Sequence, residues 1–123
     1  MTTVPLYDSL CAGAPSPISD GEAFDLANHL IQHPYDTFYV RVSGDSMTGS
    51  GIFDGDLLIV DRKAEPHHSS IVVAQVGDGF TVKQFQHDER HLRLVPTNPD
   101  HLPIEISEDT RIYGVATFAI HRL

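Results

Sequence analysis

Apolar residues in this chain come in short runs that are bounded by aspartate, glycine or proline. The clearest run lies at 57–60, where four aliphatic residues follow one another between Asp56 and Asp61. A continuous apolar run of this length is typical of a β-strand that is buried on both faces. Further segments have the length and composition of strands. They span 38–42, 71–76, 80–86, 91–95 and 111–120. The sequence therefore predicts a mostly β fold.

One short helix is predicted ahead of these strands. Apolar residues recur at helical spacing within 25–32, and Pro34 ends the pattern. Asp25 can cap the first turn, or Ser19 and Glu22 can form a capping box for an earlier start. Both starts stay open, and the helix is short in either case.

The segment before this helix has no sustained period. It contains Pro5, Pro15 and Pro17, and it follows neither a helical nor a strand repeat for long. Residues 1–24 are therefore expected to form a flexible N-terminal arm. Residues 25–123 are expected to form a single compact β domain.

The charge balance limits the partners that the chain can bind directly. There are 8 Lys and Arg residues against 17 Asp and Glu, a net charge of −9, whereas proteins that wrap a nucleic-acid backbone need clustered basic side chains. Cys11 is the one cysteine, which excludes an intrachain disulfide and favours a reducing, cytoplasmic setting. No apolar stretch approaches the roughly 20 residues that span a bilayer. A membrane location is therefore not expected.

Ser46 stands where a nucleophile could be presented to a substrate. It lies in a glycine-containing turn, Ser43-Gly44-Asp45-Ser46-Met47, directly after the strand predicted at 38–42. A serine hydroxyl becomes a nucleophile only when a base takes its proton. The chain must therefore supply a histidine or a lysine that reaches Ser46.

A lysine acts as such a base only when it is neutral. Its free pKa of about 10.4 must fall to about 7 or 8, which corresponds to roughly 4 kcal/mol of differential stabilisation. Burial must supply this energy. Lys83 lies in the middle of the strand predicted at 80–86, whereas Lys63, the second of the two lysines, lies in a polar turn. Lys83 is therefore the candidate base.

Other interpretations of these residues stay open. The chain has 8 histidines, and a Ser-His pair is possible because catalytic partners meet in space rather than along the chain. The spacing of His87 and His91 suits a metal ion on a helix, but no third ligand accompanies them, so no metal site is expected. Ser46 could also be a simple turn former, and Lys83 a solvent-facing strand residue.

Three segments together resemble the LexA/UmuD family of self-cleaving serine peptidases (S24), most closely its UmuD type. They are Ser43-Gly44-Asp45-Ser46-Met47, residues 51–61, and Phe80-Thr81-Val82-Lys83. Lys83 follows Ser46 by 37 positions (83 − 46 = 37), as in the UmuD type. Shorter matches extend the resemblance over nearly the whole chain. They lie at Pro5-Leu6, 30–34, 108–110 and Gly114-Val115.

The resemblance implies a Ser/Lys catalytic dyad with no cofactor and no metal. Ser46 would be the nucleophile, Lys83 its general base, and the backbone amide of Ser46 a donor to the oxyanion. The target would be the chain's own arm, at Ala12-Gly13. UmuD proteins commonly present Cys-Gly, whereas here Cys11 stands one place earlier and the Ala-Gly pair is typical of LexA.

The same resemblance implies a role in SOS mutagenesis. A RecA filament on single-stranded DNA would stimulate self-cleavage, and the processed homodimer would join a UmuC-type polymerase to form the lesion-bypass DNA polymerase V. Only about 20 to 35 residues precede the catalytic strands, too few for the helix-turn-helix domain with which LexA reads operators. Direct sequence-specific DNA binding is therefore not expected.

Two alternative functions stay open at this point. The chain could be a dimeric binding module that does not cleave itself, in which Ser46 and Lys83 are structural residues. It could also be a truncated LexA-like repressor core. A Ser46→Ala change separates the first alternative from the peptidase, because it abolishes cleavage and spares folding.

Overall fold

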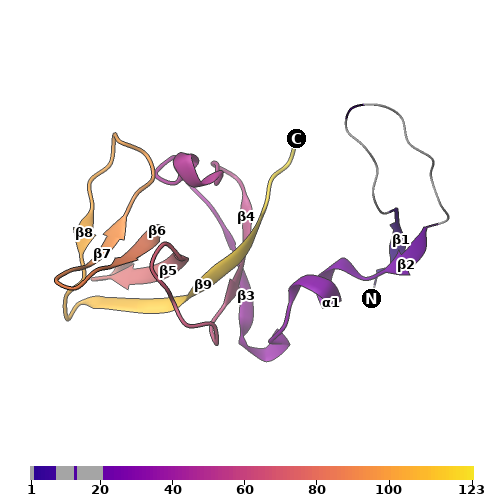
Figure 1. Ribbon diagram of the computed structural model, residues 1–123, viewed down its shortest axis with the longest axis horizontal. Coiled ribbons are helices and arrows are strands. Elements are labelled where there is room, and N and C mark those ends of the chain that lie inside the picture. The colour runs from indigo at the N-terminus through magenta and orange to yellow at the C-terminus, as the bar shows by residue number, and fades with distance from the viewer. Residues whose placement is uncertain (1, 8–12, 14–20) are drawn as a thin grey trace. The chain divides into compact units, whose positions relative to one another are not determined.

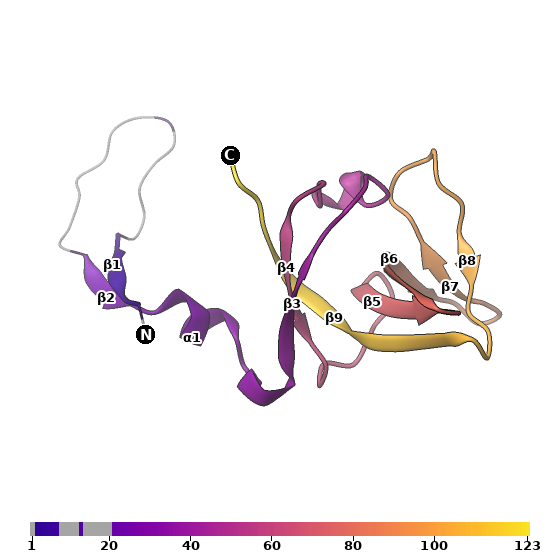
Figure 2. The ribbon, with the colours of Figure 1, turned by 180° about the vertical axis from the view of Figure 1, so that it is seen from behind.

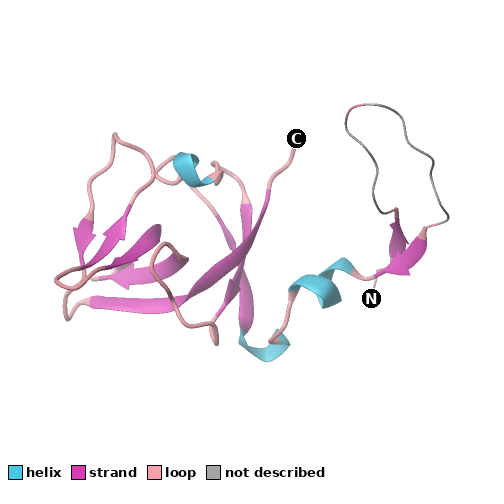
Figure 3. Ribbon diagram, viewed as in Figure 1, coloured by secondary structure: helices cyan, strands magenta, loops and turns pink. Residues whose placement is uncertain are grey.

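The computed structural model describes residues 2–7, 13 and 21–123. The chain divides into two compact units, Met1–Gln32 and His33–Leu123. Strands dominate, and the helical segments are short (Figure 3). The mostly β fold with one short α-helix is therefore confirmed.

The first unit contains a small strand pair followed by the helix. Strand β1 (Val4–Leu6) pairs antiparallel with β2 (Glu22–Phe24), and helix α1 spans Leu26–Leu30. Asp25 caps this helix, since its Oδ1 accepts a hydrogen bond of 3.2 Å from the backbone N–H of Asn28. Of the two predicted starts, the structure therefore has the later one, because Glu22 of the earlier start belongs to β2, while Ser19 lies outside the described residues.

The second unit contains a seven-stranded sheet in the order β3-β4-β9-β5-β6-β7-β8, with every neighbouring pair antiparallel (Figures 1 and 2). The strands are β3 (Thr37–Arg41), β4 (Leu57–Asp61), β5 (Ile71–Val76), β6 (Gly79–His87), β7 (Leu92–Val95), β8 (Ile104–Glu105) and β9 (Thr110–Ile120). Two 3-10 turns, Pro34–Asp36 and Thr48–Ser50, precede β3 and β4. The strands predicted from the sequence all form, with ends that move by at most one residue.

Strand β9 joins the two halves of this sheet and carries two register shifts. It pairs with β5 through its first half and with β4 through its second half. The shifts leave Tyr113 and Thr117 as extra residues on β9. Such bulges bend a strand and increase its twist, which lets one strand follow both halves of the sheet (Figure 1).

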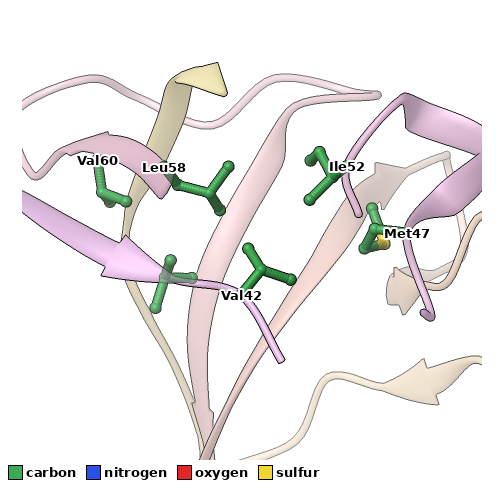
Figure 4. Packing of buried hydrophobic residues seen from close by; sticks show 6 residues of the cluster. Val42, Met47, Ile52, Leu58 and Val60 are labelled. Atoms are coloured by element: carbon green, nitrogen blue, oxygen red, sulfur yellow. The ribbon is translucent and has the colours of Figure 1, made fainter. Parts of the chain in front are cut away.

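The larger hydrophobic cluster lies between β3, β4 and the turns that connect them. Val42, Met47, Ile52, Leu58 and Val60 converge there (Figure 4), together with Val73 of β5. Leu58 and Val60 are fully buried and Ile59 is 3% exposed, so the apolar run at 57–60 is buried on both faces as predicted. A smaller cluster contains Val72, Ala74 and Leu94.

Met47 connects this core to the candidate nucleophile. It is 2% exposed and directly follows Ser46 in the chain. Burying a methionine side chain contributes roughly 1.5–3 kcal/mol. The turn that carries Ser46 is thereby anchored in the core at its next residue.

Gly114 makes a close approach between β9 and β4 possible. A Cβ atom at this buried position would lie 2.7 Å from Val60 Cγ1 and 3.1 Å from the carbonyl oxygen of Asp61. We therefore expect Gly114→Ala to lower the free energy of unfolding by about 1–3 kcal/mol, the usual cost of overpacking. Urea unfolding measures this difference.

Gly79→Ala is the matched control, because a Cβ there would meet only the carbonyl oxygen of Val76, at 3.8 Å. We expect this variant to unfold within about 0.5 kcal/mol of the wild type. Equal stability of the two alanine variants would contradict the packing argument at Gly114.

Candidate active site

The turn that carries Ser46 is held at its start by the loop before β4. Val42 donates its N–H to the carbonyl of Asp56 at 2.8 Å, and Gly55 donates its N–H back to the carbonyl of Val42 at 2.8 Å. Gly44 has φ +96°, which a glycine adopts readily, and its N–H donates to Asp54 Oδ1 at 2.8 Å. The chain therefore leaves β3 along a fixed path toward Ser46.

Asp56, whose backbone carbonyl accepts from Val42, also has a buried carboxylate side chain. Its side chain is 2% exposed and accepts from the N–H of Phe53 at 2.8 Å and from His121 Nδ1 at 2.6 Å. The backbone hydrogen bond from Phe53, followed by the one from His121, holds the pKa of this carboxyl below its usual value, although burial acts in the opposite direction. Each oxygen of the carboxylate accepts one hydrogen bond, which favours its ionised form.

Lys83 reaches Ser46 from the neighbouring part of the sheet. Strand β6 carries Lys83, and its Nζ lies 3.0 Å from Ser46 Oγ. Nζ also lies 2.7 Å from Thr81 Oγ1 and 3.2 Å from the carbonyl oxygen of Val82. Burial lowers the pKa of Lys83 from its ordinary value, because desolvation disfavours the charged form.

These three contacts fit a neutral amine as well as an ammonium group. A neutral lysine has two N–H donors and one lone pair, whereas an ammonium group has three donors and no acceptor. Thr81 Oγ1 and the carbonyl of Val82 can accept the two N–H groups. In the neutral form, the lone pair would be left for the hydroxyl hydrogen of Ser46, as a general base requires, whereas an ammonium group would donate its third N–H to Ser46 Oγ.

Thr81 was not singled out in the sequence. Strand side chains alternate between the two faces of a sheet, so residues two apart lie on the same face. Thr81 and Lys83 are two apart on β6, and this spacing was the available signal. A hydroxyl group beside a candidate lysine on the same strand face is therefore worth noting in such a sequence.

An open cleft of about 600 Å³ lies over this pair. Its walls are mainly apolar, with Phe80 and Tyr113 in edge-to-face contact at 5.1 Å between ring centroids. The guanidinium carbon of Arg62 lies 5.9 Å from the centre of the Tyr113 ring. The lining residues are Phe38, Val40, Arg41, Val42, Ser43, Ser46, Met47, Arg62, Val73, Phe80, Thr81, Val82, Lys83 and Tyr113. Clefts of this size and composition accommodate a peptide segment or a small molecule.

The remaining predicted site residues lie elsewhere in the chain. Gly13 is exposed and belongs to the first unit. Ala12 and Cys11 lie outside the described residues. The structure therefore brings Ser46 and Lys83 together, and the scissile bond stays a prediction.

The competing base is not found beside Ser46. Across residues 2–7, 13 and 21–123, no histidine forms a hydrogen bond with Ser46 Oγ. Three histidines pair with aspartates instead, and the pairs are His33–Asp61, His101–Asp45 and His121–Asp56. The part of the chain that the structure describes also contains no group of three or more His, Cys, Asp or Glu residues placed to hold a metal ion.

The lowered pKa of Lys83 can be measured without any reaction. We expect its side-chain amine to titrate below the ordinary lysine range, because burial disfavours its charged form. Lys63 is the internal reference, since its side chain is 63% exposed. Heteronuclear NMR of the two side chains, recorded as the pH is raised, gives both midpoints in one sample. Coincident midpoints would contradict the desolvation of Lys83.

The described helices contain none that is long and apolar enough to cross a membrane.

Comparison with known proteins places the chain in one family. Residues 5–117 match the family described as Peptidase S24-like. Protein SamA of Salmonella typhimurium is 41% identical over 124 residues, a match that covers 98% of this chain and 87% of SamA. Protein ImpA of Escherichia coli is 40% identical over 122 residues, covering 96% of this chain and 83% of ImpA.

A LexA repressor is also similar. The repressor of Xylella fastidiosa is 39% identical over 107 residues, which cover 86% of this chain and 51% of the repressor. This chain therefore spans about half the length of that repressor. The family match, which covers most of the chain, agrees with the resemblance to LexA/UmuD proteins, and the chain belongs to the peptidase S24-like family.

Proposed function

We propose that this UmuD-like protein cleaves its own N-terminal arm with Ser46 and Lys83 and acts in SOS mutagenesis. The arm, residues 1–24, carries the target bond at about Ala12-Gly13, and residues 25–123 supply the peptidase. The observation that carries the proposal is the 3.0 Å contact between Lys83 Nζ and Ser46 Oγ. The lowered pKa of Lys83 supports it, since a serine nucleophile needs a neutral base at that distance.

In the first step, the neutral amine of Lys83 accepts the hydroxyl proton of Ser46 while Oγ attacks the carbonyl carbon of Ala12. The Ser46 N–H donates to the oxyanion that forms. The C–N bond to Gly13 then breaks, and the ammonium of Lys83 gives its proton to the departing amine of Gly13. An acyl-enzyme on Ser46 and a free N-terminus at Gly13 result.

In the second step, Lys83 is neutral again and takes a proton from a water molecule that attacks the acyl carbon. Collapse of this second intermediate returns the proton to Ser46 Oγ and releases residues 1–12 with a free carboxylate. Each proton that Lys83 accepts is given up within the same half-reaction. The cycle therefore needs no cofactor and no metal.

The processed homodimer would then serve as the accessory subunit of a UmuC-type translesion polymerase, DNA polymerase V, in the cytoplasm. The proposed trigger is a RecA filament on single-stranded DNA. The family and the extended similarity to SamA and ImpA support this assignment. The net charge of −9 supports contact with DNA through these partners rather than by direct sequence-specific binding.

Intact mass against time tests the reaction. The full chain is incubated at alkaline pH, or near neutral pH with RecA, single-stranded DNA and a nucleotide. We expect a product that begins at Gly13, formed faster as the pH rises because more Lys83 is neutral. Ser46→Ala and Lys83→Ala are expected to reduce the rate by more than about a thousandfold.

Lys63→Ala is the matched control, because Lys63 is exposed and pairs with Asp36 at 3.7 Å, away from the cleft. It should cleave at the wild-type rate. A wild-type mass that never changes under either condition would refute the proposed peptidase activity. Cleavage that persists in Lys83→Ala would refute the role of Lys83 as the base.

Thr81 gives a second test of the geometry around Lys83. Thr81→Val keeps the shape of the side chain but removes the acceptor 2.7 Å from Nζ. We expect the cleavage rate to fall about tenfold, a loss comparable to one ordinary hydrogen bond of about 0.5–1.5 kcal/mol. Thr81→Ser retains the hydroxyl group and should cleave within about twofold of the wild type. Equal rates for the valine and serine variants would contradict a role for the hydroxyl group.

A further inference from the structure

The loop between β7 and β8 contacts the backbone on both sides of Ser46. Thr97 donates its N–H to the carbonyl of Ser46 at 2.9 Å. Asn98 donates from Nδ2 to the carbonyl of Asp45 at 2.9 Å. Two consecutive residues of one loop therefore hold the two carbonyl groups that flank the nucleophile in the chain.

The same loop is fitted closely to the turn after Ser46. Gly49 donates its N–H to the carbonyl of Thr97 at 2.8 Å, and Thr97 Oγ1 lies 2.8 Å from Ser50 Oγ. A Cβ atom on Gly49 would lie 2.1 Å from the carbonyl oxygen of Thr97. This approach is possible only because residue 49 is a glycine.

The contact from Asn98 fixes the direction of one N–H group. The carbonyl of Asp45 and the N–H of Ser46 belong to the same peptide unit, which is planar and trans, so they point in opposite directions. Holding the Asp45 carbonyl against Asn98 therefore aims the Ser46 N–H away from the loop. Within the described part of the chain, the Ser46 N–H donates to no acceptor, which leaves it available to a ligand.

The side chain of Asn98 is itself fixed in orientation. Its Oδ1 accepts from the N–H of Asp100 at 3.0 Å, while its backbone carbonyl accepts from the N–H of His101 at 3.1 Å. A flipped amide would place Oδ1 against the carbonyl of Asp45 and Nδ2 against the N–H of Asp100, losing both bonds. Nδ2 is therefore the atom that faces Asp45.

We propose that Asn98 is a positioning residue, which aims the Ser46 N–H at the oxyanion of the reaction. This inference rests on the proposed self-cleavage. A hydrogen bond to the Asp45 carbonyl also polarises that peptide unit, which makes the Ser46 N–H a stronger donor. Asn98 acts through the peptide and does not touch the substrate.

The test compares three variants by intact mass at alkaline pH. Asn98→Asp keeps the size of the side chain and the acceptor for Asp100, but replaces the donor to Asp45 with a carboxylate. Asn98→Ala removes both contacts. Losing an oxyanion donor lowers the reaction rate about a hundredfold to a thousandfold. We therefore expect a misdirected donor to lower the cleavage rate about a hundredfold in Asn98→Asp and about tenfold in Asn98→Ala.

His101→Ala is the matched control. His101 Nε2 lies 2.7 Å from Asp45 Oδ1, so this variant removes a contact to the side chain of Asp45 but none to its peptide. Both side chains of that pair are exposed, at 41% and 66%, and exposed pairs contribute little. We expect cleavage within about twofold of the wild type.

Two readouts separate positioning from a general loss of structure. The cleavage rate of the Asn98 variants should be lower than that of the wild type at every pH. The pH midpoint at which the rate increases should be unchanged, because the deprotonation of Lys83 sets it. In a non-cleaving Lys83→Ala background, adding Asn98→Asp should shift the amide NMR signal of Ser46. The melting temperature should stay within a few degrees of that of the Lys83→Ala protein. Either Asn98 variant suffices if the other does not fold.

The outcomes are distinguishable. If the wild type cleaves and the Asn98 variants cleave within twofold of its rate, the inference about Asn98 is overturned and the proposed function stands. The inference is also overturned if the Ser46 amide signal does not shift in Asn98→Asp. A loss of rate in His101→Ala as large as that in the Asn98 variants overturns it as well. Wild type that never cleaves overturns the proposed function and, with it, the positioning role of Asn98.

Discussion

The chemistry proposed for this site depends on keeping one lysine amine partly out of water. A water-exposed lysine stays charged near neutral pH and cannot accept a proton. In this fold Lys83 lies on β6, is held by Thr81 Oγ1 and the carbonyl of Val82, and loses enough solvent for its pKa to fall. In the proposed mechanism, this amine would activate the serine hydroxyl that lies 3.0 Å from it.

The fold brings Ser46 to this amine by restraining a turn from several sides. Met47 lies in the hydrophobic core directly after it. Asp54 and the backbone of Asp56 hold the entry to the turn, and the loop at Thr97 holds its exit. Each restraint comes from a different part of the chain, so the position of Ser46 depends on the whole sheet being formed.

The sequence singled out Ser46 and Lys83 because their local contexts are unusual, and the structure places Lys83 Nζ 3.0 Å from Ser46 Oγ. Ser46 follows a strand through a glycine-containing turn, and Lys83 interrupts an apolar strand pattern. It did not predict the contacts of Thr81 and Asn98, which depend on which strand face and which loop meet the Ser46 turn in space. The short strands β1, β2 and β8 were also missed, because two or three residues are too few to show a period.

The strand β4 shows how the fold tolerates the pH range in which Lys83 becomes neutral. Buried aspartates flank it, Asp56 before and Asp61 at its end, and each pairs with a histidine. Burial alone would raise the pKa of Asp61, but the hydrogen bonds from His33 and from the N–H of Lys63 outweigh it, so both aspartates have lowered pKa values. A lowered carboxyl pKa stabilises the fold above the unfolded-state value, about 3.9, and this stabilisation is lost only as the pH falls through the folded value. Raising the pH to deprotonate Lys83 therefore leaves both carboxylates ionised and their backbone hydrogen bonds in place, and a neutral histidine ring can still donate its N–H to them.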